Sequence, residues 1–196
     1  MNQLKLATRD RHVALERQLP LLDPALSLRD YRQCLARFLG YFAPLEQALL
    51  GQTGWDAIGF DYADRLKTPR LALDLLALGA TPKAVAALPQ CQRLPPVDSL
   101  PSLLGCLYVI EGAGLGGQVI TRHLRASLGL TPATGGAFFF GDGELTGPRW
   151  KAFVQDLKRQ VAEQGGGDAV IASANLTFAT LDDWLFAPAL PARLAA

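Results

Sequence analysis

The chain has 196 residues, of which 49% are hydrophobic and 19% are charged, a composition typical of compact globular proteins and unlike that of disordered chains. This length is enough for one substantial core, and no Ser/Gly-rich or charge-rich linker divides it, so we expect a single domain over residues 1–196. The formal net charge of +1 provides no broad basic surface, which argues against nucleic acid or an anionic membrane as the principal partner.

The N-terminal segment MNQLKLATRDRHVALERQL carries charges in every helical turn and lacks a continuous apolar stretch. It therefore predicts neither a signal peptide nor a membrane span, and a cytoplasmic location is the default expectation. The three cysteines, Cys34, Cys91 and Cys106, are odd in number and lack the spacing of metal ligands. Reduced thiols in a cytosolic core fit this pattern better than a disulfide framework or a zinc site.

Apolar residues recur every three or four positions along most of the chain, which predicts helices. The first helix covers residues 4–19 and stops at Pro20, and the second begins at a capping pair, Ser27 and Asp30, and ends at Gly51. The inner side of the second helix is expected to carry Tyr31, Leu35, Phe38, Leu39, Phe42, Leu45 and Leu49.

Capping residues, prolines and glycines mark the ends of the later helices. Strand candidates are limited to VIEG and AFFFG, and neither lies in a regular βα alternation. We therefore expect an all-α domain of roughly seven or eight helices. The later helices are predicted at 71–79, after Thr81, from Asp98 or Ser99 to 112 or on to 130, at 148–163 and at 168–186.

Residues 108–118, YVIEGAGLGGQ, contain four glycines within six positions. The spacing Gly112-x-Gly114-x-x-Gly117 matches the dinucleotide fingerprint, which also needs an acidic residue about 20 positions later at the end of a second strand. The first acids after the motif are Asp142 and Glu144 in a glycine-rich turn, so this requirement fails. No Lys-Ser or Lys-Thr follows the glycines, which excludes a P-loop.

Four glycines in a helix cost on the order of 2 to 4 kcal/mol relative to alanine. Close helix packing or a bend explains one or two of them, and both interpretations remain open. A run of this cost favours a broad, flat ligand, such as the face of a porphyrin, lying against the backbone where any Cβ atom would collide with it.

The sequence contains only two histidines. His12 lies on the apolar stripe of the first helix, with Glu16 one turn later and Lys5 about two turns earlier. A neutral imidazole binds iron through one nitrogen while the other donates to a carboxylate, a role open to Glu16, and Lys5 is placed to meet a propionate. The alternative is an ordinary boundary histidine.

His123 follows Gly116 by seven residues, so both lie on one helix face two turns apart. It is a candidate for a second polar contact at the edge of the ligand. The alternative, that His123 faces solvent beside Arg122 and Arg125, agrees equally well with the periodicity.

With these residues assembled, the chain resembles the biliverdin-producing heme oxygenases, and most of all the bacterial members associated with bacteriophytochromes. Four segments carry the resemblance: LKLATRDRHVALE at 4–16, LGCLYVIEGAGLGGQVITRHL at 104–124, FFFGDGELTGPRWKAF at 138–153 and NLTFATLDDWL at 175–185. The first two are specific when taken together, and the other two support the match.

The resemblance implies one all-helical domain with heme between the first helix and a kinked, glycine-rich distal helix. It implies that His12 is the proximal iron ligand, that Glu16 hydrogen-bonds it, and that Gly112 and Gly116 contact heme and serve catalysis. The remaining positions carried over are Gly117 and Gln118 in the same motif, Lys5 and His123 near the propionates, and Phe178 near the ring edge.

The implied reaction uses heme as both cofactor and substrate, with O2 and electrons from an external donor such as a ferredoxin or a flavin reductase. Its products are biliverdin, CO and ferrous iron, and a bacteriophytochrome is the implied receiver of biliverdin. Some family members carry an aspartate directly after the first distal glycine, where this chain has Ala113. The alternatives are a heme-binding or heme-delivery protein without turnover and a nicotinamide-dependent oxidoreductase.

Overall fold

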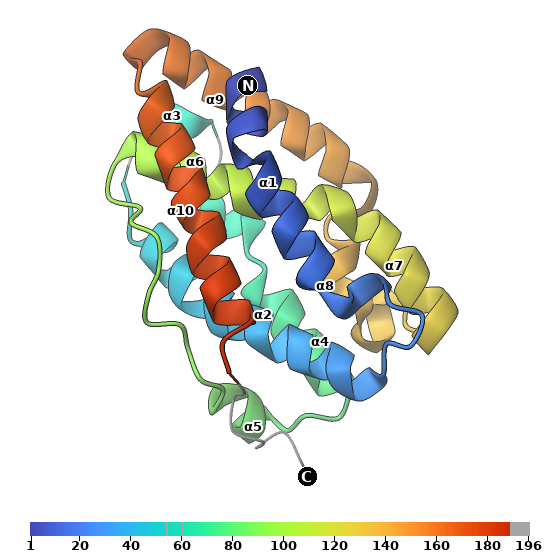
Figure 1. Ribbon diagram of the computed structural model, residues 1–196. Helices are drawn as coiled ribbons and strands as arrows, with labels where there is room; N and C mark the ends of the chain where they lie inside the picture. Colours follow the sequence, from blue (N-terminus) through green and yellow to red (C-terminus); the bar gives the residue numbers. More distant parts are fainter. Residues whose placement is uncertain (54, 60, 189–196) are drawn as a thin grey trace.

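In the computed structural model, which describes residues 1–53, 55–59 and 61–188, every regular element is helical (Figure 1). The predicted all-α class is confirmed, because VIEG lies in the last turns of α6 and AFFFG forms α8 with the glycine that ends it. The longer helices are α1 (Asn2–Gln18), α2 (Leu28–Leu50), α4 (Thr68–Ala77), α6 (Leu100–Gly112), α7 (Gly114–Leu128), α9 (Thr146–Gln164) and α10 (Gly167–Leu185).

Short helical turns connect these elements and account for most of the excess over the predicted seven or eight helices. The turn after Thr81 was predicted, and the others were not, since one turn of helix in a glycine- or proline-rich connection has no periodicity to detect. The connecting turns are α3 (Trp55–Ile58), α5 (Pro82–Ala86), α8 (Ala137–Phe140), the 3-10 turns η1 (Pro20–Leu22), η2 (Tyr62–Arg65) and η4 (Gly143–Leu145), and the π turn η3 (Pro132–Gly136).

The second helix, α2, forms much of the core. The Ser27 hydroxyl accepts a hydrogen bond of 3.1 Å from the Asp30 amide and caps the first turn, as predicted. All seven residues predicted for its inner side are buried, which confirms the periodicity.

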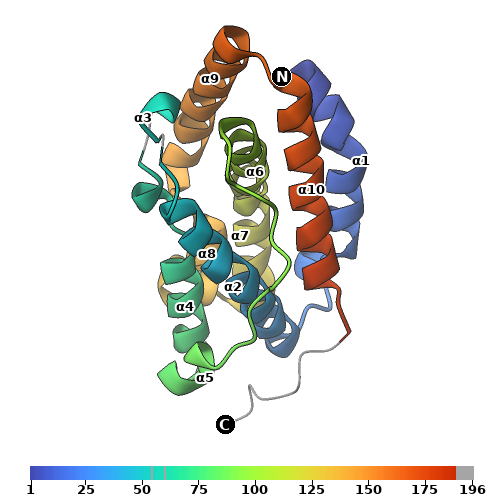
Figure 2. The same cartoon turned by 90° about the vertical axis from the view of Figure 1, so that its left-hand side faces the viewer.

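Helix α6 lies at the centre of the molecule, between α10 on one side and α9 on the other (Figure 2). Gly105 allows the close approach of α10, because a Cβ atom there would lie 2.5 Å from the carbonyl oxygen of Val170. The stretch Leu100–Leu128 is long and apolar enough to cross a membrane by length and composition. In α6 these apolar side chains are buried against neighbouring helices, so they belong to the protein core.

Helix α1 packs along α10, with Leu4, Thr8 and Leu15 buried. The turn η1, which follows α1, contacts α7. The N-terminal part of the chain therefore packs on α10 through α1 and on α7 through η1. The three cysteines carry free thiols, and within the described ranges no group of side chains has the arrangement of a metal-binding cluster.

Candidate functional site

The glycine-rich segment lies where α6 ends and α7 begins. Ala113 separates the two helices and keeps right-handed backbone angles, with φ of −57° and ψ of −29°. The helical path therefore continues from α6 into α7 and is interrupted only at the exposed residue Ala113.

The four glycines have different neighbours, which gives them different reasons to lack a side chain. A Cβ atom on Gly112 would lie 3.3 Å from the Trp150 ring, and one on Gly114 would lie 3.3 Å from the Thr146 methyl group. A Cβ atom on Gly117 would collide with the carbonyl oxygen of Phe139 in α8. Packing against α8 and α9 thus explains more of the run than the sequence indicated.

Gly116 differs from the other three glycines. It is exposed, and a Cβ atom built on it has no protein atom within 4 Å. The neighbouring apolar side chains of Leu115 and Val119 are exposed as well. Packing within the described protein does not require glycine at 116, so the space beside it is available to a ligand.

His12 occupies an inner position of α1, between buried Thr8 and Leu15, yet 51% of its side chain is accessible to solvent. Its Nδ1 lies 3.4 Å from a carboxylate oxygen of Glu16, and its ring meets the edge of Phe178 at a centroid distance of 6.0 Å. The contact with Glu16 is the one expected for positions one helical turn apart, whereas the contact of His12 with Phe178 of α10 was not predicted.

The Glu16 contact leaves the second imidazole nitrogen, Nε2, with no hydrogen-bond partner among residues 1–53, 55–59 and 61–188. A histidine held by a carboxylate through Nδ1 and open at Nε2 has the arrangement that metal-binding histidines show in proteins. The chemistry of this side chain fits the fifth ligand of a heme iron.

The predicted contacts at the ligand edge are less fully assembled. Lys5 is exposed on α1, and no carboxylate pairs with it in the part of the chain that the structure describes. His123 Nε2 lies 3.1 Å from the carbonyl oxygen of Asp23, so the ring connects α7 to the loop before α2. Gln118 is exposed on α7, where its carbonyl accepts a bond of 3.4 Å from Arg122.

A buried charged cluster directly before the glycines was missed by the sequence reasoning. Glu111 pairs with Arg65 at 3.1 Å and with Lys67 at 2.6 Å, and the exposed fractions of the three side chains are 9%, 9% and 15%. The available signal was a single carboxylate near the end of the apolar helix LPSLLGCLYVIEG, since an unpaired charge is rarely buried there.

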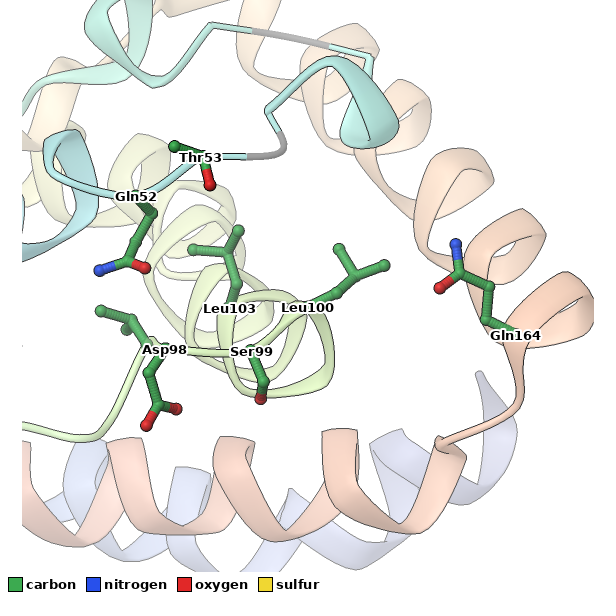
Figure 3. A pocket seen from close by; sticks show the side chains of 8 residues that line it. Gln52, Thr53, Asp98, Ser99, Leu100, Leu103 and Gln164 are labelled. Carbon is green, nitrogen blue, oxygen red and sulfur yellow. The ribbon is translucent and has the colours of Figure 1, made fainter.

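A separate cavity of about 310 Å³ lies at the opposite end of α6 (Figure 3). Ser99, Leu100 and Leu103 contribute to its wall, roughly 14 to 20 Å along the helix from Gly112 at 1.5 Å per residue. Neither the glycines of residues 112–117 nor His12 line this cavity.

Figures 1 and 2 show α1 on the same side of the α6–α7 segment as α10. His12 on α1 thus has an accessible imidazole, and α7 carries a glycine beside open space together with exposed apolar side chains.

The heme oxygenase family model matches residues 1–187 of this chain. A heme oxygenase from Xanthomonas campestris pv. campestris (strain 8004) is 34% identical over 164 residues, which cover 82% of this chain and 92% of the relative. The chain belongs to the heme oxygenase family, and it is an enzyme that opens the ring of its substrate heme with O2.

Solved structures show the same fold. The NO- and CO-bound heme oxygenase from Neisseria meningitidis superposes with a TM-score of 0.77 at 19% identity, covering 99% of this chain and 95% of that one. Heme oxygenase from Leptospira interrogans gives a TM-score of 0.73 at 16% identity, covering 93% and 96% of the two chains.

Proposed function

We propose that this heme oxygenase holds its substrate between α1 and the α6–α7 segment, with His12 as the iron ligand. The observation that carries the assignment is the state of His12, an inner-face residue that stays half exposed and is held at Nδ1 by Glu16. Because Nδ1 faces Glu16, the accessible Nε2 is the nitrogen that is available to an iron atom.

Glu16 and Phe178 are proposed to orient the imidazole. The carboxylate accepts a hydrogen bond from Nδ1–H, which fixes the tautomer with Nε2 free for the iron and keeps the ligand neutral. The edge of Phe178, which is buried in α10, limits rotation of the ring. A neutral histidine suits this chemistry, since a thiolate ligand would favour O–O cleavage.

On the distal side, Gly116 is proposed to leave room beside the face of heme that lies opposite His12. Bound heme supplies O2 activation at the iron and the carbon skeleton that is oxidised. With no Cβ at 116, the backbone of α7 can approach the ring, and no side chain at this position obstructs the meso edge. Gly112 belongs to the same backbone segment at the end of α6.

Lys5 and His123 are proposed propionate contacts. The exposed Lys5 ammonium on α1 is available for a carboxylate, and His123 has a competing partner in the Asp23 carbonyl. Propionate binding at His123 would therefore displace or supplement that hydrogen bond.

The partners implied by the resemblance complete the proposal. Electrons come from an external reductase or ferredoxin, biliverdin passes to a bacteriophytochrome, and the reaction takes place in the cytoplasm. Mixing the purified phytochrome apoprotein with the turning-over enzyme tests the second statement, because assembly of a red-absorbing chromoprotein reports transfer of biliverdin.

The His12→Ala variant tests the central assignment. We expect the heme complex to lose the absorption spectrum of histidine-ligated heme and to regain it when imidazole is added to fill the cavity. Glu16→Gln serves as the matched control, because it should retain ligation. An unchanged spectrum in His12→Ala would show that iron is bound elsewhere.

Aerobic incubation of the wild-type heme complex with ascorbate or a reductase tests the reaction. Loss of the Soret band together with formation of biliverdin is the expected result. A persistent oxy or ferric spectrum would instead identify a heme carrier without turnover. Analysis of the biliverdin isomer from the same sample shows which meso carbon is attacked.

A further inference from the structure

The buried cluster around Glu111 connects three parts of the fold at the start of the glycine-rich segment. Glu111 is the residue before Gly112, and its two carboxylate oxygens bind different cations, Arg65 through Oε2 and Lys67 through Oε1. Both cations come from η2 and the short linker after it. The end of α6 is therefore fastened to a segment more than 40 positions earlier in the chain.

Lys67 extends this connection to α2. Its backbone amide donates a hydrogen bond of 2.6 Å to Glu46, which is almost fully buried in α2, and the Thr68 amide donates another of 3.0 Å to the same carboxylate. The Tyr62 hydroxyl also donates to Glu46, at 3.2 Å. Through Lys67, the rigid core helix α2 supports the end of α6.

A buried carboxylate that pairs with two cations is an expensive way to join two elements, since all three groups lose water. Apolar side chains of similar size would provide comparable or greater stability. Each carboxylate oxygen of Glu111 contacts one cation, at 2.6 Å for Lys67 and 3.1 Å for Arg65, and such contacts are directional. They therefore point to a geometric role, in which the ion pairs fix the position of the C-terminal end of α6.

The neighbouring sequence explains why such a fixed point is useful. Gly112, Gly114 and Gly116 have no side chains to interlock with other helices, and α6 and α7 are interrupted at Ala113. Backbone of this kind is the natural place for local motion. Glu111 is the last residue before it with a side chain that reaches the core.

We propose that Glu111 is a positioning residue for the heme oxygenase reaction. Held by Arg65 and Lys67, it sets the distance between the glycine-rich backbone of α6 and α7 and the face of bound heme. The inference rests on the proposed placement of heme between α1 and α7. It assigns Glu111 no contact with heme or O2, only control of the backbone that makes such contact.

The first test uses ligand-free protein and hydrogen–deuterium exchange. Glu111→Gln should raise exchange of the amides in 111–120 by tenfold or more relative to wild type. Ser173→Ala is the matched control, because Ser173 donates a buried hydrogen bond of 2.7 Å to the Ser102 carbonyl near the other end of α6. It should raise exchange near 100–105 and leave 111–120 unchanged.

The second test separates positioning from general destabilisation in the heme complex. Glu111→Gln should slow ring opening about tenfold, change the heme dissociation constant less than threefold and alter the CO dissociation rate. Ser173→Ala should leave the heme dissociation constant and the CO dissociation rate unchanged. The charge exchange Glu111→Lys with Lys67→Glu should recover exchange protection and turnover in part.

Equal exchange of 111–120 in Glu111→Gln and wild type would overturn the proposal, as would equal losses of turnover and heme affinity. If Glu111→Gln does not fold, Lys67→Met, which removes one of the two ion pairs, provides the same comparison. Failure of the proposed heme placement is recognised separately, because His12→Ala would then keep a wild-type heme spectrum whatever the exchange data show.

Discussion

At the scale of single residues, Gly116 and Gly117 are adjacent in sequence and yet differ in what a side chain would meet. A side chain at 116 would project into open space, whereas one at 117 would collide with the Phe139 carbonyl. Substitution at these two positions therefore separates a glycine needed for the reaction from a glycine needed for packing.

We expect Gly116→Leu to leave the melting temperature of the ligand-free protein unchanged or slightly raised, because glycine in a helix costs about 1 kcal/mol relative to better helix formers. The leucine side chain would occupy the space beside heme, so ring opening should fall at least tenfold while heme affinity falls less. Thermal unfolding and the yield of biliverdin measure the two effects. Wild-type turnover would show that α7 does not approach the reacting edge at 116.

Gly117→Ala should give the opposite result. The new methyl group forces α7 and α8 apart, and overpacking of this kind costs about 1 to 3 kcal/mol. We expect a lower melting temperature and a loss of heme binding in proportion to it. A stable Gly117→Ala protein with defective turnover would return Gly117 to the group of heme contacts that the resemblance implies.

At the scale of elements, the distance between α6 and α10 depends on Gly105. A Cβ atom there would lie 2.5 Å from the Val170 carbonyl oxygen and 2.8 Å from the Ala174 amide nitrogen, and neither backbone atom can move independently of α10. We expect Gly105→Ala to destabilise the fold by about 1 to 3 kcal/mol or more in urea unfolding. Gly147→Ala in α9 is the control, since its Cβ meets no atom within 4 Å, and it should be neutral or stabilising. Similar midpoints for both variants would contradict the close helix contact.

Element positions were predictable because caps and periodicity are local. Ser27 and the buried face of α2 agree with the structure for this reason. The site was only partly predictable. Helical spacing places Glu16 beside His12, but it does not show that Phe178 meets the His12 ring, that Gly117 faces α8 or that His123 reaches Asp23. Those contacts depend on how distant elements pack, and the Glu111 cluster was missed for the same reason.

At the scale of the whole molecule, the same core that supports the site holds titratable groups away from water. Burial raises the pKa of the Cys106 thiol to about 12, against smaller opposing effects of Thr177 and Lys67, and raises that of Cys34 to about 11 with a further contribution from Asp30. Burial also raises the pKa of Tyr62 well above its ordinary value, with added repulsion from Glu46 and Glu111. The core therefore favours the neutral form of each group.

Stability should consequently fall at alkaline pH. Above the ordinary thiol pKa of about 8.5 to 9, the unfolded chain releases thiol protons that the folded chain retains, so rising pH favours unfolding. Each such thiol contributes a slope that approaches about 1.4 kcal/mol per pH unit until its folded pKa is reached. Below pH 8 both states hold these protons, and the contribution is constant. Urea unfolding between pH 8 and 10 under reducing conditions measures this slope, to which the buried tyrosines add as the pH approaches their ordinary pKa of about 10.

Cys106→Ala shows whether the slope has this origin. The variant loses some stability at every pH through the small cavity it creates, so the informative quantity is the change with pH and not the absolute value. We expect the free energy of unfolding of Cys106→Ala to fall less steeply between pH 9 and 10 than that of wild type, by about one proton's contribution. Parallel curves would mean that Cys106 ionises equally easily in both states, which is incompatible with a thiol sealed between α6 and its neighbours. The same experiment can be done on the heme complex. Heme that binds only the folded chain should raise the free energy of unfolding of wild type and of Cys106→Ala equally, so the difference between the two pH curves should not change.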